Sequence, residues 1–386
     1  MADVFVGFVF DEDKEKELLH LSKCGVGTAA NQYQKGFISG LSERVIILST
    51  ISTGAFPRMN KRLFFPIEQK SLPEGEFVYL PFINCYFIRD FMFENGLYRH
   101  LSRIIESQQH TTVYVYSLYM PSLRAMARLK EQYGDKLHYC LIIPYLPGKY
   151  GLVRSGIKGI RDRYEVRAKM TLPNQADSFV FLTDAMKELF EPKPYAVIEG
   201  FLPKCEFDYS KRRIPKTVLY TGSLNRAFGL DTLLNAFSQI EDEDAQLWIC
   251  GAGDMEAEIK EAASEDPRII FKGFLPKSEI TALQTQCDVL INPRLPEGEY
   301  TKYSFPSKTM EYLLSGSKVV MHRLPGIPDE YYQYIRIIDG YKPQAIADAI
   351  DGAFCDKEFY ESRWQEQVNW IQTSKNSREG IRRLKV

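Results

Sequence analysis

Residues 303–316 read Tyr-Ser-Phe-Pro-Ser-Lys-Thr-Met-Glu-Tyr-Leu-Leu-Ser-Gly, and they combine the signals that start a helix with those that end one. Pro306 suits the first position of a helix, and Ser304 or Phe305 suits the capping position before it. Gly316 suits the left-handed position that follows the last turn. The stretch therefore predicts a short helix that begins at Pro306 and ends before Gly316.

The side chains of this helix divide into two faces. At about 100° per residue, Lys308 and Glu311 share one face, and an apolar set covers the opposite one. The apolar set is Met310, Leu313 and Leu314. The start of a helix has free backbone N–H groups and a positive dipole end, so a phosphate placed there meets Lys308 while Glu311 reaches a hydroxyl. The pattern is typical of a nucleotide site, although a surface ion pair at a spacing of three explains the same two charges.

The bulk composition describes a globular protein of two domains. The chain has 386 residues, and its formal net charge of −1 offers no general attraction to nucleic acid. Its 7 cysteines are scattered and include no Cys-x-x-Cys pair, which indicates buried thiols in a reducing compartment. The N-terminus lacks a basic region before its apolar run, and no segment reaches the roughly 18 apolar residues of a membrane span. We therefore expect a cytoplasmic protein.

The first half of the chain shows a repeated strand–helix pattern. Residues 4–10 predict a strand, residues 29–41 a helix and residues 44–50 the next strand. Gly25 to Gly27 lie in the loop between the first strand and the helix. Further strands are expected near residues 77–83, 112–116, 137–143 and 178–182, and helices near 86–106, 121–133 and 157–170. The strands are apolar throughout, which is typical of a parallel sheet covered on both faces.

A second series of the same kind begins after residue 203. Strands are expected at residues 217–220, 246–250, 269–272, 289–292, 318–321 and 335–338, with helices between them. The fold class is therefore α/β, with one doubly wound domain over residues 1–203 and another over 204–355. Residues 356–386 are helical in pattern, and we expect them to return to the first domain.

Ligands of such sheets bind outside the carboxyl ends of the strands. The loops after the first strand of each domain contain Gly25 and Gly27, and then Gly222, Ser223 and Arg226. Glycine lets the backbone approach a phosphate, and an arginine neutralises one, but an ordinary tight turn has the same composition. The chain has neither Gly-x-Gly-x-x-Gly nor a P-loop motif, which argues against a standard dinucleotide enzyme and a P-loop ATPase.

Two further segments have open interpretations. Residues 149–169 carry seven basic and two acidic side chains, which fits a solvated helix face or a contact with anionic lipid headgroups or a lipid-linked diphosphate. Residues 53–73 join Arg58, Lys61 and Arg62 to apolar Leu63 and its neighbours. This segment is a candidate acceptor-binding or membrane-facing loop, or else a loop that packs against the rest of its domain.

The second half resembles the donor-binding domain of the family 4 glycosyltransferases, which are retaining enzymes with the GT-B fold. The matching pieces, in chain order, are Tyr220–Leu224, Gly229, Leu233–Phe237, Leu247–Gly253, Ile270–Phe274, Asp288–Pro293 and residues 303–316. The first half matches less, at the loop around Gly25, at Ala176–Val180 and at Val197–Gly200. Residues 305–312 resemble a variant common in bacterial surface-polysaccharide glycosyltransferases. The resemblance implies two Rossmann-like domains facing each other across a cleft.

The resemblance also implies roles for residues on the donor side. Glu311 matches the second glutamate of a family pair spaced eight residues apart, the one that binds the ribose hydroxyls. The first glutamate, which contacts the donor sugar, falls on Tyr303, so that contact would have to come from Glu297 or Glu299. The customary arginine and lysine of the first loop fall on Ser223 and Phe228, so Arg226 and Lys308 are the nearest replacements and the expected catalytic cations. The implied nucleotide-sugar site comprises Gly222, Ser223, Arg226, Phe274, Ser304, Phe305, Ser307, Lys308 and Glu311.

The acceptor side is expected in the first domain, at Gly25, Gly27, Tyr116 and Tyr145. The tyrosines lie at strand ends, where stacking on a sugar and packing in the core are both plausible. His110 and His138 border strands, and we interpret them as structural residues.

The implied reaction moves a hexose or N-acetylhexosamine from a UDP-sugar to a glycan or lipid-linked acceptor with retention of configuration. It needs no metal and no cofactor, and the partners are the donor and acceptor, without nucleic acid. The expected location is the cytoplasm, with possible peripheral contact at the plasma membrane through residues 149–169. The alternatives are a catalytically weak subunit that partners another glycosyltransferase and a GT-B nucleotide-sugar epimerase.

Overall fold

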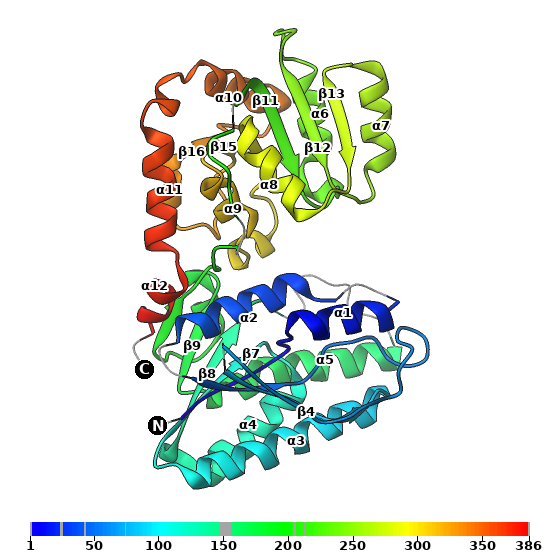
Figure 1. Ribbon diagram of the computed structural model, residues 1–386, viewed down its shortest axis with the longest axis vertical. Coiled ribbons are helices and arrows are strands. Elements are labelled where there is room, and N and C mark those ends of the chain that lie inside the picture. Colours follow the sequence, from blue (N-terminus) through cyan, green and yellow to red (C-terminus); the bar gives the residue numbers. More distant parts are fainter. Residues whose placement is uncertain are drawn as a thin grey trace. The chain divides into compact units, whose positions relative to one another are not determined.

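The computed structural model describes residues 2–23, 26–41, 44–73, 75–146, 156–203, 206–211 and 213–384 (Figure 1). The chain forms two compact units, which are described separately. Unit 1 runs to Phe201 and resumes at Asn376, and unit 2 comprises Leu202–Lys375. No helix in the described ranges combines the length and the hydropathy needed to cross a membrane.

Unit 1 is built on a mainly parallel sheet. Its eight described strands lie in the order β10-β9-β8-β7-β1-β2-β5-β4, and β4 pairs antiparallel with β5. Central strand β1 places Val4 opposite Ile46 on one side and opposite Val113 on the other. The strands are β1 (Ala2–Gly7), β2 (Val45–Ser49), β4 (Glu68–Leu72), β5 (Gly75–Tyr79), β7 (Thr111–Tyr116), β8 (Leu137–Ile143), β9 (Ser178–Phe181) and β10 (Tyr195–Val197).

Helices cover both faces of this sheet because the chain winds outward from β1 in both directions. Figure 1 shows α1 and α2 on one face and α3 and α4 on the other. Strands β3 (Phe64–Phe65) and β6 (Phe82–Ile83) form a separate antiparallel pair. The helices are α1 (Glu12–Leu21), α2 (Thr28–Gly40), α3 (Tyr86–Ser107), α4 (Met120–Tyr133), α5 (Gly156–Thr171) and α12 (Ser377–Arg382).

Unit 2 has a fully parallel sheet with the strand order β13-β12-β11-β14-β15-β16. In sequence order this is 3-2-1-4-5-6, the order of a doubly wound nucleotide-binding sheet, and its switch point lies between β11 and β14. The strands are β11 (Ile214–Thr221), β12 (Gln246–Cys250), β13 (Ile269–Gly273), β14 (Cys287–Asn292), β15 (Lys318–Met321) and β16 (Ile335–Ile337).

Two hydrophobic cores lie on the two faces of the unit 2 sheet. One contains Leu233 of α6, Ile259 of α7 and Ile350 of α10. The other contains Leu313 of α9 and Ile371 of α11. The helices are α6 (Leu230–Phe237), α7 (Glu256–Glu265), α8 (Lys277–Gln286), α9 (Lys308–Leu314), α10 (Pro343–Cys355) and α11 (Arg363–Ser374).

The C-terminal helices divide between the two units. Helix α11 belongs to unit 2, where Val368 and Ile371 are buried beside α9. Helix α12 belongs to unit 1, where Ser39 of α2 donates a hydrogen bond to Ser377 at 3.2 Å. The predicted return to the first domain started at residue 356, whereas the segment counted with unit 1 starts at Asn376.

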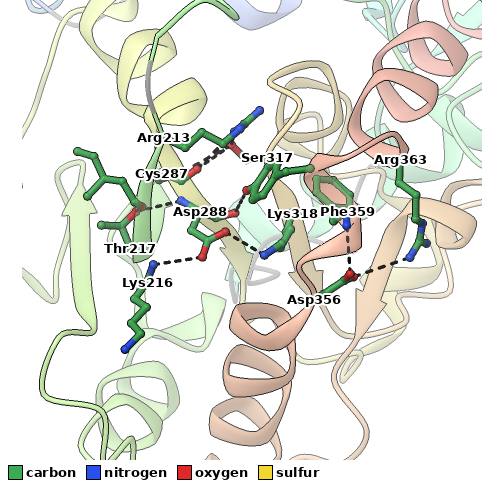
Figure 2. Close-up of polar contacts among 12 residues, drawn as sticks. Arg213, Lys216, Thr217, Cys287, Asp288, Ser317, Lys318, Asp356, Phe359 and Arg363 are labelled. Atoms are coloured by element: carbon green, nitrogen blue, oxygen red, sulfur yellow. Dashed lines mark hydrogen bonds and ion pairs between the residues drawn. The ribbon is translucent and has the colours of Figure 1, made fainter.

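A buried polar cluster ties together the amino-terminal ends of β11, β14 and β15 (Figure 2). One oxygen of Asp288 pairs with Lys318 Nζ at 3.1 Å, and the other accepts from the Lys216 N–H at 3.1 Å. Lys216 has a φ of 56°, and the pairing of β11 with β14 shifts register around it. Thr217 Oγ1 accepts from the Asp288 N–H at 2.9 Å. Asp288 therefore holds the irregular start of β11 in place.

Candidate nucleotide site

The candidate site lies at the carboxyl ends of β11 and β14, on the two sides of the switch point in unit 2. The glycine that follows β11 and the glycine that follows β12 have no room for side chains. A Cβ on Gly222 would lie 2.6 Å from Lys308 Nζ, and one on Gly251 would lie 1.8 Å from the Gly222 carbonyl oxygen. Gly222 also has a φ of 133°, which few other residues adopt. The structure therefore brings together Gly222 and Lys308, two residues of the predicted site.

Lys308 is the cation at the centre of this site. Its ammonium group donates to the Thr221 carbonyl oxygen at 2.7 Å and lies 4.3 Å from the centroid of the Tyr220 ring. Burial lowers the pKa of Lys308 to about 8, the carboxylate of Glu311 acts in the opposite direction, and the charge of Arg294 lowers the pKa further. The site therefore holds a cation whose charge has little compensation.

Glu311 is held from helix α8. Its Oε1 accepts from Gln284 Nε2 at 2.6 Å, and its Oε2 forms an ion pair with Lys277. Gln284 Oε1 is buried and has no hydrogen-bond partner among the described residues. Next along α9, the Tyr312 hydroxyl accepts from the Thr221 N–H at 3.1 Å, which fixes the helix against the end of β11. Lys308 and Glu311 thus face the same strand end but bond to different groups.

Arg294 is a second cation in this site, and the sequence interpretation missed it. Its guanidinium lies 5.7 Å from the Phe228 ring and 4.7 Å from the Tyr300 ring, and its Nη2 donates to Ser304 Oγ at 3.2 Å. Its Nε is buried without a partner, and no carboxylate among the described residues pairs with it. The available signal was its place directly after Asn292 and Pro293 at the end of β14.

Arg226, the other predicted cation, bonds elsewhere. Its Nη2 donates to Glu258 at 2.8 Å, and its Nη1 lies 3.8 Å from Asp231. Its side chain is 57% exposed. Two carboxylates therefore already neutralise Arg226, whereas Arg294 has no carboxylate partner among the described residues.

The start of helix α9 differs from the prediction. The helix begins at Lys308 with Ser307 as its N-cap, two residues later than the predicted start at Pro306. The reason is the burial of Phe305 against Tyr331, with ring centroids 5.3 Å apart, which holds the chain extended before a turn in which the Thr309 N–H donates to the Pro306 carbonyl. The predicted helix end is confirmed, because Gly316 has a φ of 74°.

The remaining donor-side residues lie in different environments. Phe274 follows β13 and is 81% exposed, whereas Phe305 is a core residue. Ser223 and Ser307 are exposed, and Ser304 contacts Arg294. Tyr303, at the position where an acid was expected, is only 4% exposed. Glu297 and Glu299 are exposed in the loop after β14.

The acceptor-side residues of unit 1 separate into packed and open positions. Tyr116 is buried with its ring centroid 5.8 Å from that of Tyr33, and burial raises the pKa of its phenol. Tyr145 is 51% exposed, and its hydroxyl is 3.0 Å from Ser117 Oγ. Gly27 is the N-cap of α2, and Gly25 lies outside the described residues.

Other sequence-predicted features of unit 1 are also placed. His138 Nε2 is 3.0 Å from Ser178 Oγ, and the half-exposed His110 lies 3.4 Å from the Lys136 carbonyl oxygen. The basic run of residues 149–169 is described only from Gly156 on, and its side chains only from Tyr164 on. Within the described part of the chain, no group of three or more His, Cys, Asp and Glu side chains is arranged to hold a metal ion.

Comparison with known proteins places unit 2 near glycosyltransferases. Residues 215–356 match the family model described as Glycosyl transferases group 1. A curated relative, 2-deoxystreptamine glucosyltransferase of Streptomyces kanamyceticus, is 30% identical over 116 residues. That match spans 28% of this chain and 28% of the relative. The family match contains the whole candidate site.

Solved structures resemble the chain over nearly its whole length. Sucrose-phosphate synthase of Thermosynechococcus elongatus has a TM-score of 0.62 at 15% identity, covering 97% of this chain and 95% of that one. Trehalose 6-phosphate synthase of Burkholderia multivorans has a TM-score of 0.61 at 11% identity, covering 98% and 96%. The pneumococcal O-GlcNAc transferase bound to UDP and GlcNAc has a TM-score of 0.57 at 10% identity, covering 99% and 97%. The chain therefore has the GT-B fold of two Rossmann-like domains, as the sequence predicted.

Proposed function

We propose that the chain is a retaining glycosyltransferase that takes a hexose or N-acetylhexosamine from a UDP-sugar and passes it to a glycan or lipid-linked acceptor. The observation that carries the proposal is the pair of cations, Lys308 and Arg294, at the switch point of the unit 2 sheet. The matched relative is a glucosyltransferase, and a structure of the same fold binds UDP and GlcNAc, which supports the choice of donor. The surface-polysaccharide setting rests on the resemblance of residues 305–312.

The cations act on the leaving group. In the transfer, the bond between the sugar carbon and the diphosphate oxygen breaks, and the diphosphate departs with the electron pair. The acceptor oxygen bonds to that carbon and gives its proton to the departing diphosphate. Negative charge therefore grows on the diphosphate in the transition state. Lys308 and Arg294 stabilise that charge in a partly dehydrated site, where charge-assisted hydrogen bonds are strongest. On this proposal the two side chains do the work that a metal ion does in other transferases.

Glu311 binds the nucleoside part of the donor. A carboxylate accepts two hydrogen bonds from vicinal hydroxyls, and Gln284 and Lys277 hold this carboxylate in a fixed orientation. The ribose therefore lies against α8 and α9, with the diphosphate toward Lys308.

Calorimetry with UDP, GDP, ADP and UMP tests the donor site directly. We expect UDP to bind, and we expect Lys308→Met to weaken it at least about tenfold, since a hydrogen bond to a charged group contributes roughly 1.5–3 kcal/mol. Lys260→Met is the matched control, because Lys260 is a surface residue paired with Glu256 in the same unit. If the folded wild-type protein binds none of these nucleotides, the proposal is wrong.

A second assay separates the transferase from its alternatives. Incubation of UDP-sugars with a glycan or lipid-linked acceptor panel should yield a transferred sugar with the anomeric configuration of the donor, read by NMR. Conversion of the donor sugar without any acceptor would instead indicate an epimerase.

A catalytically weak subunit is the second candidate, and the buried Tyr303 favours it. A phenol that is 4% exposed stands where the first glutamate of the family's pair is expected, and the two glutamates that could replace it, Glu297 and Glu299, are exposed. If the chain is such a subunit, it should bind UDP without hydrolysis or transfer and should co-purify with a partner glycosyltransferase. Transfer by the isolated chain would exclude it.

A further inference from the structure

One surface of unit 1 exposes large apolar side chains from two segments of the chain. The segment of residues 56–67 contributes Met59, Leu63, Phe64 and Ile67, and the start of helix α3 contributes Ile88 and Phe91. Phe64 is 53% exposed and Phe91 is 69% exposed. Exposure of that much phenylalanine surface to water is unfavourable in free energy. Several exposed apolar side chains together are typical of an interaction site. We refer to these six residues as the apolar surface.

The two segments are joined by direct contacts, so they form one surface. Phe64 of β3 pairs with Ile83 of β6, two residues before the cap of α3. The Asn84 N–H donates to the Leu63 carbonyl at 2.6 Å, and Arg89 Nη1 donates to the Thr53 carbonyl at 2.6 Å.

The apolar surface rests on a packed layer. Beneath it, Phe65 stacks on Phe82 with ring centroids 4.6 Å apart, and Phe82 lies 4.8 Å from Phe93. All three of these rings are buried. The exposed side chains are therefore presented by an ordered support and are not the flank of a loosely packed core.

Cations without an ion-pair partner border the apolar surface, whereas the acids next to it are paired. Glu68, which follows Ile67, pairs with Lys14, and Asp90, between Ile88 and Phe91, lies 3.8 Å from Arg89. Residues 51–67 contain Arg58, Lys61 and Arg62 and no aspartate or glutamate. Arg62 pairs with Glu17, whereas Arg58 and Lys61 are exposed. The ammonium of Lys61 donates to the His20 carbonyl at 3.1 Å, a contact that leaves its charge without a carboxylate partner in the described residues.

A third cation borders the same segment. Lys23 Nζ donates to the Pro57 carbonyl at 3.3 Å, and the Lys23 N–H donates to the Met59 carbonyl at 2.9 Å. These contacts place the ammonium of Lys23 beside the segment that carries Met59. Apolar side chains and uncompensated cations are thus interspersed on one surface.

We propose that this surface binds an anionic lipid bilayer, with the apolar side chains at the boundary between headgroups and acyl chains and with Lys23, Arg58 and Lys61 against anionic headgroups. This composition matches a membrane interface, where apolar insertion and attraction to anionic lipid act together. A second copy would bring the same excess of unpaired cations to the contact, whereas an anionic bilayer supplies the opposite charge, so the bilayer is the occupant that we propose. The proposal is independent of the donor chemistry in unit 2.

Sedimentation of the full-length protein with vesicles tests the proposal. We expect binding to phosphatidylcholine vesicles that contain phosphatidylglycerol, weak binding to phosphatidylcholine alone, and a loss of binding as salt is raised. The double variant Arg58→Gln/Lys61→Gln should bind about thirtyfold more weakly, from the usual contribution of two cations near a membrane. Phe64→Ser/Phe91→Ser should bind at least about tenfold more weakly, because it removes the apolar insertion.

Matched controls come from unit 2. Tyr341→Ser removes an aromatic residue that is 60% exposed, and Lys357→Gln removes an exposed cation, so both should bind vesicles as the wild type does. All variants should keep the thermal midpoint of the wild type, because the substituted side chains are on the surface. Wild-type protein that stays in the supernatant with anionic vesicles at low salt would overturn the proposal. A second result would also overturn it. If light scattering shows a dimer that only the two double variants of the apolar surface abolish, the face is a contact between copies of the chain.

Discussion

Raising the pH from 7 to 9 should weaken the binding of UDP through Lys308. Burial and the neighbouring charge of Arg294 lower the pKa of Lys308 to about 8, with Glu311 acting in the opposite direction. The ammonium form attracts the diphosphate, and the neutral amine does not. Affinity should therefore be highest below pH 8 and fall as the pH rises above it.

The size of the effect follows from the charged fraction of Lys308. For a pKa of about 8, that fraction is about 0.9 at pH 7 and about 0.1 at pH 9, so the affinity should fall about tenfold, or about 1.4 kcal/mol. A bound diphosphate raises the pKa of the ammonium, so binding at pH 8 should take up about half a proton per site. The pH dependence of stability without ligand has the opposite sign. Between pH 8 and the ordinary lysine pKa of 10.5, the unfolded chain binds more protons at Lys308 than the folded protein does, so the free energy of unfolding rises with pH.

Calorimetry at pH 7, 8 and 9, in two buffers of different ionisation enthalpy, measures both the affinity and the proton uptake. Lys308→Arg is the control, because a guanidinium keeps its charge over this range and should remove the step at pH 8. Any titration of the nucleotide itself is common to both proteins. Equal pH slopes for the two proteins, or no proton uptake by the wild type at pH 8, would refute the assignment of Lys308 to the diphosphate.

Three substitutions test other parts of unit 2. Arg294→Gln should weaken UDP binding by roughly 10- to 100-fold, as expected for a lost charge-assisted hydrogen bond, whereas Arg226→Gln should change the calorimetric affinity less than about threefold because its partners are Glu258 and Asp231. Glu311→Gln should reduce the preference for UDP over its 2′,3′-dideoxy analogue, measured in the same way, and an unchanged preference would remove the ribose role. Asp288→Ala should lower the free energy of unfolding by about 3–5 kcal/mol in urea, since it leaves Lys318 buried without a counter-charge.

The architecture was accessible from sequence because both halves repeat one local pattern. Uninterrupted apolar strands alternate with helices, and these features depend on neighbours in the chain. The same holds for the end of α9, where Gly316 adopts the left-handed conformation that its residue type favours. The rule that ligands bind at carboxyl ends of strands then directed attention to Gly222 and Lys308, which the fold brings together.

The start of α9 and the choice of cation depend on distant residues. Pro306 carries the local signal for a helix start, yet Phe305 is buried against Tyr331, and that tertiary contact delays the helix to Lys308. The packed layer below the exposed residues of unit 1 likewise joins β3 to β6, which are separated along the chain. Local patterns hold no information on such partners.

The contrast between Arg226 and Arg294 shows why proximity to a glycine loop is a weak guide to a phosphate site. Both arginines follow a strand at the switch point, but Arg226 bonds to carboxylates from α6 and α7, and any anion it bound would compete with them. Arg294 is held by aromatic rings and a hydroxyl. It lies near Lys308, and its charge lowers the pKa of the Lys308 ammonium group. Two like charges kept together in this way lower the stability of the free protein, and perturbed groups of this kind concentrate at functional sites. A diphosphate bound between Lys308 and Arg294 relieves that repulsion, so the same arrangement that costs folding free energy favours the ligand.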